Sequence, residues 1–389
     1  MLTKNINFKN FPYKITNNTI SIFNDIKKSY FLGKDKLLLT LSDKYKYSFN
    51  LKKISKLKKF QICRIIGMGG SSLGAEAIYN FLKFKIKKKF VFIDNLNPVI
   101  KKKKLINNHV NIIISKSGNT LETILNSNLL VSKKKNNIII TENRNNYLKK
   151  LATDIKAEIF EHKNYIGGRY SVLSEVGMLP AEIMGLSEKK FKRFNHLINN
   201  NNFLNQLILN VSAILKFVKQ GKLNSVILNY DEKSDNFFKW YQQLVAESLG
   251  KKSKGILPVI SSMPKDNHSL LQLYLDGPKN NFFTFFSSLD KKSDIVNNKF
   301  LQKSHNYLKN KSFSKIIYAQ KNATEKVFYK KKLPFRSFEV KRRSEETLGE
   351  LFCFFILETI LLGRALKVNP FDQPSVELIK KETKKILFN

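Results

Sequence analysis

The sequence predicts an α/β protein with two helix-covered parallel sheets. Short apolar runs rich in β-branched residues alternate with longer helical patterns, first from about residue 60 and again from about residue 220. Strands that are apolar on both faces and separated by helices are typical of parallel sheets covered on both sides. The chain has 389 residues, of which 42% are hydrophobic, so it is long enough to form more than one core.

The first α/β unit is predicted within residues 60–190. Its predicted strands are Ile62–Ile66, Phe90–Asp94, Asn111–Ser115 and Asn137–Thr141. Helical patterns occupy Ala75–Phe84 and Leu121–Val131. We therefore expect strands and helices to alternate through this unit, after an N-terminal segment of residues 1–59.

A polar run at Asn199–Asn202 separates a second α/β unit, which we place in residues 191–345. Its predicted strands are Val226–Tyr230, Gly255–Ser261 and Phe282–Phe286, and its predicted helices are Phe237–Gly250 and Ser269–Leu275. A C-terminal segment of residues 346–389 should be helical, with one helix over Ser344–Leu366 and another over Val376–Leu387. The apolar stretch Leu351–Leu366 contains Glu358 and Arg364, so it predicts a buried helix rather than a membrane span.

The chain carries a large excess of positive charge. It has 70 Lys and Arg against 30 Asp and Glu, a formal net charge of +40. Such an excess fits a nucleic-acid or anionic-membrane partner, but Lys and Asn recur along the whole chain and no nucleic-acid recognition motif is present. We therefore expect a general property of the surface, with neither a nucleic-acid nor a membrane partner.

The two cysteines, Cys63 and Cys353, stand in apolar contexts that predict core positions rather than a disulfide. The first residues lack the apolar run of a secretory signal. Both observations favour a cytoplasmic location.

A glycine-rich turn, Gly67–Gly74, lies between the strand Ile62–Ile66 and a helix. Glycines there let backbone N–H groups approach an anion at the start of the helix. A kinase-type phosphate loop is excluded, because no Gly-Lys-Ser/Thr follows. A dinucleotide site stays open, since Asp94 ends the next strand, although Ser72 occupies the third glycine position. A tight turn without a ligand is the remaining interpretation.

A second turn rich in hydroxyls follows the strand Asn111–Ser115. The hydroxyls of Ser115, Ser117, Thr120 and Thr123 span the start of the next helix, where they can converge with free backbone donors on a phosphate. Ordinary N-capping explains one such hydroxyl more easily than four. Two anion-binding turns in one unit suggest a phosphorylated ligand.

Six blocks of sequence, in this order, resemble the glucose-6-phosphate isomerase family. They are GMGGSSLG, SKSGNTLET, GGRYSVLSEVG (Gly167–Gly177), ESLGK (Glu247–Lys251), DNHS (Asp266–Ser269) and NPFDQPSVELIK (Asn369–Lys380). The first two are shared with many phosphosugar-binding proteins, whereas the later ones are more specific. The resemblance implies two sugar-isomerase (SIS) αβα sandwich domains with parallel sheets, and a homodimer with active sites at the subunit interface.

The chemistry of aldose-ketose isomerisation requires one base that moves a proton between neighbouring carbons through an enediol or enediolate. It also requires positive charge for the developing oxyanion. No cluster of His, Cys, Asp or Glu has metal-ligand spacing, so we expect no metal and no other cofactor. A cation of the protein must supply the charge.

Glu247 is the candidate base, on the predicted helix Phe237–Gly250. Gln243 precedes it by four residues and shares its face, while Phe237 and Leu244 should anchor the helix. The resemblance implies that Glu247 carries the proton between carbons 1 and 2. In the absence of this resemblance, a carboxylate near the end of a helix is usually interpreted as a surface group.

Three further residues have implied catalytic roles. Arg169 follows two glycines and cannot lose its proton, which suits stabilisation of the enediolate; a structural ion pair is the alternative. The resemblance implies that His268, from the partner subunit, protonates the ring oxygen when the sugar opens, and that Lys380 assists. Lys381 beside it is the alternative lysine.

The same resemblance implies contacts to the substrate. Gly70 and Ser71 would line the sugar site, and Gln243 and Gln373 would add further contacts. The phosphate would be bound by Ser115, Lys116, Ser117 and Thr120.

The implied function is reversible isomerisation of glucose 6-phosphate and fructose 6-phosphate, in glycolysis and gluconeogenesis. Two alternatives stay open: a non-catalytic phosphosugar-binding regulatory protein, and an isomerase for another sugar phosphate such as mannose 6-phosphate. A binding protein would need both anion-binding turns but not Glu247, Arg169 and His268 together, so their joint presence favours catalysis.

Overall fold

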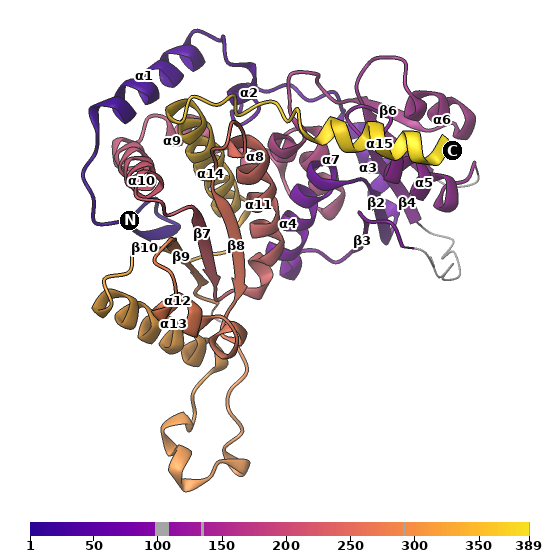
Figure 1. Cartoon of the computed structure of the whole chain (residues 1–389). Helices are drawn as coiled ribbons and strands as arrows, with labels where there is room; N and C mark the ends of the chain where they lie inside the picture. Colours follow the sequence, from indigo (N-terminus) through magenta and orange to yellow (C-terminus); the bar gives the residue numbers. More distant parts are fainter. Residues whose placement is uncertain (98–108, 134–135, 291–292, 389) are drawn as a thin grey trace.

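The structure is a computed structural model that describes residues 1–97, 109–133, 136–290 and 293–388. Its strands form two five-stranded sheets that lie side by side (Figure 1). The first sheet is parallel throughout and contains, in spatial order, β3 (Lys89–Ile93), β2 (Ile62–Ile66), β4 (His109–Ile114), β5 (Asn136–Thr141) and β6 (Glu158–Glu161). All of the predicted strands of this unit are present, with small shifts at their ends.

The second sheet contains, in spatial order, β1 (Ile6–Lys9), β10 (Phe335–Val340), β9 (Asn281–Ser288), β7 (Asn224–Asn229) and β8 (Leu257–Ser262). Only β1 is antiparallel to its neighbour, with Ile6 opposite Val340. The segment 1–59 therefore does not stand apart, because it supplies an edge strand of this sheet. The predicted fold class, α/β with two parallel sheets, is confirmed except for the antiparallel β1.

Fifteen α-helices connect and cover the sheets in the part of the chain that is described. They are α1 (Asn17–Phe31), α2 (Lys36–Leu39), α3 (Leu51–Ser55), α4 (Leu73–Phe81), α5 (Leu121–Leu130), α6 (Tyr147–Ile155), α7 (Glu175–Met184), α8 (Glu188–Phe191), α9 (Phe194–Leu197), α10 (Asn201–Lys219), α11 (Asp235–Leu249), α12 (Leu271–Asp276), α13 (Phe313–Lys330), α14 (Glu345–Ala365) and α15 (Val376–Phe388). The helices predicted at α4, α5, α11, α14 and α15 are present. Where the sequence predicts a helix from Ser269, a short 3-10 helix, η6 (Lys265–His268), comes first and α12 begins at Leu271.

The two units meet where α4 of the first packs against α11 of the second (Figure 1). Helix α14 packs on the other side of α11 and is buried along almost its whole length, as its apolar sequence predicts. None of the helices in the described ranges has the length and apolar character needed to cross a membrane. Both cysteines are buried free thiols, as predicted.

One ion pair is enclosed completely in the core of the second unit. Arg336 on β10 and Glu358 on α14 both have fully buried side chains and contact each other through two pairs of atoms. Arg336 also donates to Thr284 Oγ1 at 2.9 Å and to Asn210 Oδ1 at 2.7 Å, and Tyr241 donates to Glu358 at 3.0 Å. This ion pair explains the presence of Glu358 in the otherwise apolar helix α14, since its carboxylate neutralises the buried guanidinium of Arg336.

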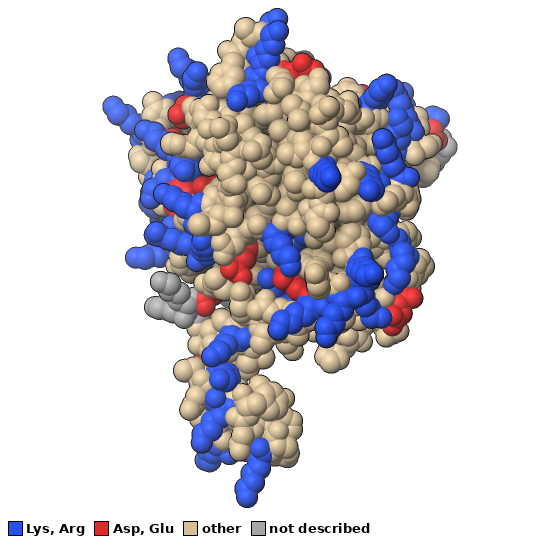
Figure 2. Space-filling view, turned by 90° about the vertical axis from the view of Figure 1, so that its left-hand side faces the viewer, with Lys and Arg blue, Asp and Glu red and all other residues tan. Residues whose placement is uncertain are grey.

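The positive charge is spread over separate parts of the surface. On the side of the molecule shown in Figure 2, Lys and Arg side chains gather in several groups around a broad area without charge. A single continuous basic stripe, as nucleic-acid binding favours, is not present on this side.

Candidate active site

The two predicted anion-binding turns lie at the same edge of the first sheet. Strand β2 pairs with β4, and the turns Gly67–Gly74 and Ser115–Thr120 follow their carboxyl ends. The chain leaves β2 towards β3 on one side and leaves β4 towards β5 on the other. Such a reversal opens a crevice at the carboxyl ends of the strands, which is where α/β sheets bind ligands.

The glycine turn is shaped by close contacts with two other segments. A Cβ atom at Gly70 would lie 2.2 Å from the carbonyl carbon of Gly168, and one at Gly69 would lie 2.8 Å from Gln243 Nε2. Gly69 also has a positive φ of 53°. Glycine is therefore required here to bring the GGRYS loop and α11 against the turn, which places Gly70 and Ser71 beside both.

The hydroxyl turn after β4 is organised by Ser115, whose side chain is buried. Its Oγ lies 2.8 Å from Thr120 Oγ1 and accepts the N–H of Gly118 at 3.2 Å. Ser117 Oγ accepts the N–H of Asn119 at 3.2 Å. Thr120 precedes α5 but its side chain does not cap the helix, so the first-turn amides remain for an anion. The geometry fits phosphate binding by Ser115, Ser117 and Thr120.

Lys116 extends from this turn towards two protein groups. Its Nζ donates to the carbonyl of Asn164 at 2.7 Å and lies 3.6 Å from Glu142 Oε1. Burial lowers the pKa of Lys116, and the neighbouring carboxylate offsets only part of this effect. Lys116 therefore adds positive charge near the turn, while its own contacts are a hydrogen bond to Asn164 and an ion pair with Glu142.

His162 is a buried histidine behind Lys116 that the sequence did not single out. It follows β6, is 2% exposed, and its Nδ1 lies 3.1 Å from the carbonyl oxygen of Lys163. Burial lowers the pKa of His162 from 6.5 to about 4, and the nearby Lys116 adds to the effect.

This shift predicts acid sensitivity. Between pH 6.5 and pH 4 the unfolded chain binds a proton at His162 that the folded chain does not, so folding stability should fall as the pH falls, by about 3 kcal/mol. Urea unfolding at both pH values measures the loss. His162→Leu should reduce the difference between them, whereas the same substitution at the exposed His305 should leave it unchanged. An equal loss in wild type and His162→Leu would contradict the assignment.

Glu247 and Arg169 lie in direct contact at the junction of the two units. Glu247 is near the end of α11, and its Oε2 accepts from Arg169 at 3.2 Å. Its Oε1 accepts from Gln243 Nε2 at 2.9 Å, as their spacing on one helix face predicts. The Glu247 side chain is 32% exposed and that of Arg169 only 1%. Hydrogen bonds to both oxygens thus fix the orientation of the Glu247 carboxylate, which is still accessible to a ligand.

Arg169 also fixes a segment that comes from the far end of the chain, Asn369–Gln373. Arg169 lies on a short 3-10 helix, η4 (Gly168–Leu173). Its guanidinium donates to the carbonyls of Pro370 at 2.6 Å and Asp372 at 3.1 Å, and to Gln373 Oε1 at 2.7 Å. Gln373, predicted to contact substrate, is thereby brought beside Glu247.

Two neighbours that the sequence analysis missed hold Arg169 in place. Ser248 Oγ accepts from Arg169 Nε at 2.8 Å, and Trp240 Nε1 donates to the Arg169 carbonyl at 3.1 Å. Both lie on α11 with Glu247, so one helix carries the carboxylate and two of the groups that orient its cation. The sequence hinted at this role through position: Ser248 directly follows Glu247, and Trp240 precedes Glu247 by seven residues on the same predicted helix.

His268 and Lys380 are not brought to Glu247 within one chain. His268 ends η6 after β8, and no hydrogen bond or ion pair of the described residues joins it to Glu247 or Arg169. Lys380 lies on α15, where its Nζ contacts Glu377 at 2.5 Å and its side chain is 63% exposed. None of the described residues of α15 is buried.

The chain is similar to known sugar-phosphate isomerases. A family model described as phosphoglucose isomerase matches residues 53–389. A relative named glucose-6-phosphate isomerase, from Methanocaldococcus jannaschii, is 34% identical over 358 residues, which cover 86% of each chain.

Two solved structures share the fold. A hypothetical protein from Thermus thermophilus superposes with a TM-score of 0.78 at 21% identity, covering 97% of this chain and 100% of that one. A glucose-6-phosphate isomerase from Chlamydia trachomatis superposes with a TM-score of 0.71 at 19% identity, covering 87% of this chain and 72% of that one.

Proposed function

Because this chain belongs to the phosphoglucose isomerase family, we propose that Glu247 and Arg169 interconvert glucose 6-phosphate and fructose 6-phosphate. The family and its named members make the chain an aldose-ketose isomerase of carbohydrate metabolism. The observation that supports these two residues most strongly is their contact at 3.2 Å beside a turn suited to phosphate.

Glu247 acts as the single base. In the open-chain aldose its carboxylate removes the proton from carbon 2, which gives a cis-enediol or enediolate. It then returns the proton to carbon 1, while the hydroxyl proton moves from O2 to O1 and leaves a ketone at carbon 2. One carboxylate suffices because the two carbons are adjacent.

Arg169 supplies a charge that is present at every stage, since a guanidinium does not titrate in this range. Arg169 contacts Glu247, and its charge lowers the energy of a negative oxygen formed next to that carboxylate. The sequence left a structural ion pair as the alternative role of Arg169. The structural and catalytic roles are compatible, because Arg169 also anchors Asn369–Gln373.

The phosphate is bound at the start of α5 by Ser115, Ser117 and Thr120, with Lys116 adding charge from nearby. The sugar contacts Gly70, Ser71 and Gln373. Gln243 is suited to a substrate hydroxyl, because its Oε1 is buried and has no hydrogen-bond partner among the described residues while Nε2 contacts Glu247.

Ring opening uses His268 and Lys380, with His268 contributed by a second copy of the chain. This proposal is supported by two regions that expose large apolar side chains in a single chain. Residues 293–312 project from the body of the molecule (Figure 1) and expose Phe300 and Tyr307, and α15 exposes Ile379 and Leu387. Burial of such surfaces in a homodimer would stabilise it. We propose a cytoplasmic location, which the buried free thiols support.

A coupled assay tests the function. Purified protein is supplied with fructose 6-phosphate, and glucose 6-phosphate is detected through an added dehydrogenase, with and without a chelator. We expect equal rates in both. Thermal stabilisation by fructose 6-phosphate without turnover would instead indicate a non-catalytic binding protein.

A further inference from the structure

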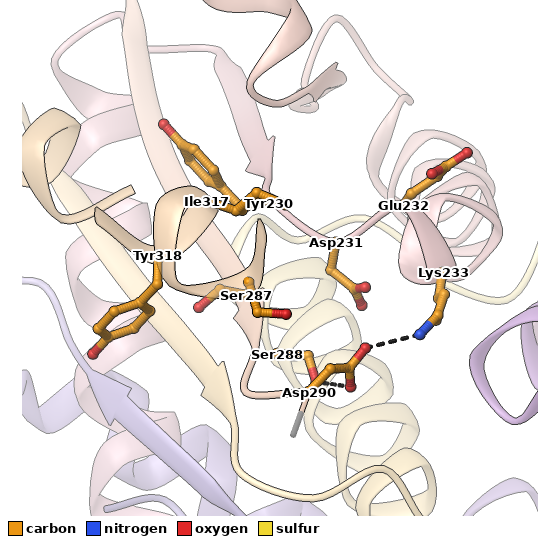
Figure 3. Close-up of a pocket in the computed structure, with 10 residues that line it drawn as sticks. Tyr230, Asp231, Glu232, Lys233, Ser287, Ser288, Asp290, Ile317 and Tyr318 are labelled. Atoms are coloured by element: carbon orange, nitrogen blue, oxygen red, sulfur yellow. Dashed lines mark hydrogen bonds and ion pairs between the residues drawn. The ribbon is translucent and has the colours of Figure 1, made fainter. Parts of the chain in front are cut away.

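The second unit contains a cavity at the position equivalent to the crevice of the first. β7 lies between β8 and β9, as β2 lies between β3 and β4. The cavity, of about 180 Å³, opens at the carboxyl ends of β7 and β9 (Figure 3). It is lined by Tyr230, Asp231, Glu232, Lys233, Ser287, Ser288, Asp290, Ser314, Ile317 and Tyr318. Neither Glu247 nor Arg169 is among these residues, so the cavity is separate from the isomerase site.

Its two inner carboxylates are held by cations. Arg343 donates to Asp231 Oδ1 at 2.5 Å and to Asp290 Oδ1 at 2.8 Å. Lys233 donates to Asp290 Oδ2 at 2.9 Å, as Figure 3 shows. Burial raises the pKa of Asp290, but the hydrogen bonds from Arg343 and Lys233 outweigh it and the pKa is lowered. Asp290 is therefore a charged hydrogen-bond acceptor whose position is fixed.

Ser287 provides an unsatisfied hydroxyl in this cavity. The residue is 4% exposed, and its Oγ has no hydrogen-bond partner among the described residues. A buried hydroxyl without a partner is unfavourable, and Ser287 lines the cavity next to Ser288 and Asp290. Rotation of its side chain into the cavity would let a ligand hydroxyl satisfy it.

The charges select the class of ligand. Three acidic residues in the lining, Asp231, Glu232 and Asp290, would repel a phosphate, unlike the turn at Ser115–Thr120. A metal ion is also disfavoured, because the carboxylates are already paired and no group of three His, Cys, Asp or Glu in the described ranges could hold one. Hydroxyl groups, in contrast, can donate to the carboxylates and accept from Ser287.

We propose that this cavity binds a small neutral polyol, such as an unphosphorylated sugar or sugar alcohol, through Ser287, Asp231 and Asp290. The volume is that of several water molecules, which suits one such molecule. The second unit would thus bind a carbohydrate without phosphate at the place where the first binds the phosphate.

The test uses D-glucitol, which has neither a carbonyl nor a phosphate, in a ligand-observed NMR titration of the full chain. Excess fructose 6-phosphate is present to occupy the isomerase site. We expect saturable binding that inorganic phosphate does not displace. Ser287→Ala should weaken it at least about tenfold. Ser225→Ala, a buried serine on β7 outside the cavity, should leave it unchanged.

A second variant covers the case in which Ser287→Ala does not fold. Ser314→Phe, at the side of the cavity formed by α13, should block glucitol binding without changing the sheet. Unchanged melting temperatures verify the folding of the variants. The proposal is overturned if no saturable binding occurs, if inorganic phosphate displaces glucitol, or if folded Ser287→Ala and Ser314→Phe both bind as wild type does.

Discussion

Glu247→Gln should lower kcat at least about a hundredfold while substrate still binds. Glutamine has nearly the same shape as glutamate, but it cannot accept the proton from carbon 2. The phosphate turn and Gln373 are untouched, so the ground-state contacts to the substrate persist. Steady-state kinetics with fructose 6-phosphate give kcat, and thermal stabilisation by the same compound reports binding.

The matched control is Asp276→Asn, which removes an exposed carboxylate paired with Lys331 at 2.5 Å. It should leave kcat unchanged. A near-normal kcat in Glu247→Gln would assign the proton transfer to another residue. A complete loss of thermal stabilisation would show that the carboxylate serves binding instead.

Glu358→Gln should destabilise the fold by about 3 to 5 kcal/mol. The substitution leaves the charge of Arg336 enclosed in the core, where neither partner has any solvent exposure. The double variant Arg336→Met/Glu358→Leu removes both charges and should be more stable than Glu358→Gln, because no buried charge remains unpaired. Urea unfolding of each variant measures these differences.

An exposed pair provides the comparison for this prediction. Glu382 contacts Lys385 at 2.6 Å with both side chains more than half exposed, so Glu382→Gln should have no measurable effect. If Glu358→Gln were equally harmless, the buried carboxylate would not be needed to neutralise Arg336.

The parts of the fold that could be predicted are those with nearly unbroken apolar strands. β2, β4, β7 and β9 lie inside their sheets and are apolar on both faces. The strands β1, β6 and β10 were missed. β1 and β6 are four-residue edge strands with polar positions, and β10 contains Arg336, whose partner Glu358 is distant in sequence.

Within the candidate site, local spacing predicted the contact between Gln243 and Glu247. Packing, however, was not predictable: Gly70 is required by a loop that begins almost a hundred residues later. Arg169 donates to the backbone carbonyls of Pro370 and Asp372. Every residue has such a carbonyl, so the residue types at these positions could not predict the contacts. The roles of His268 and Lys380 stay predictions, since they depend on a second chain.

The pairing of β1 with β10 joins residues more than three hundred positions apart. Until β1 pairs with β10 during folding, the outer edge of β10 exposes unpaired amides and carbonyls to any neighbouring molecule. Docking of β1 within the chain therefore competes with aggregation during refolding. The recovered yield should consequently decline as the protein concentration rises.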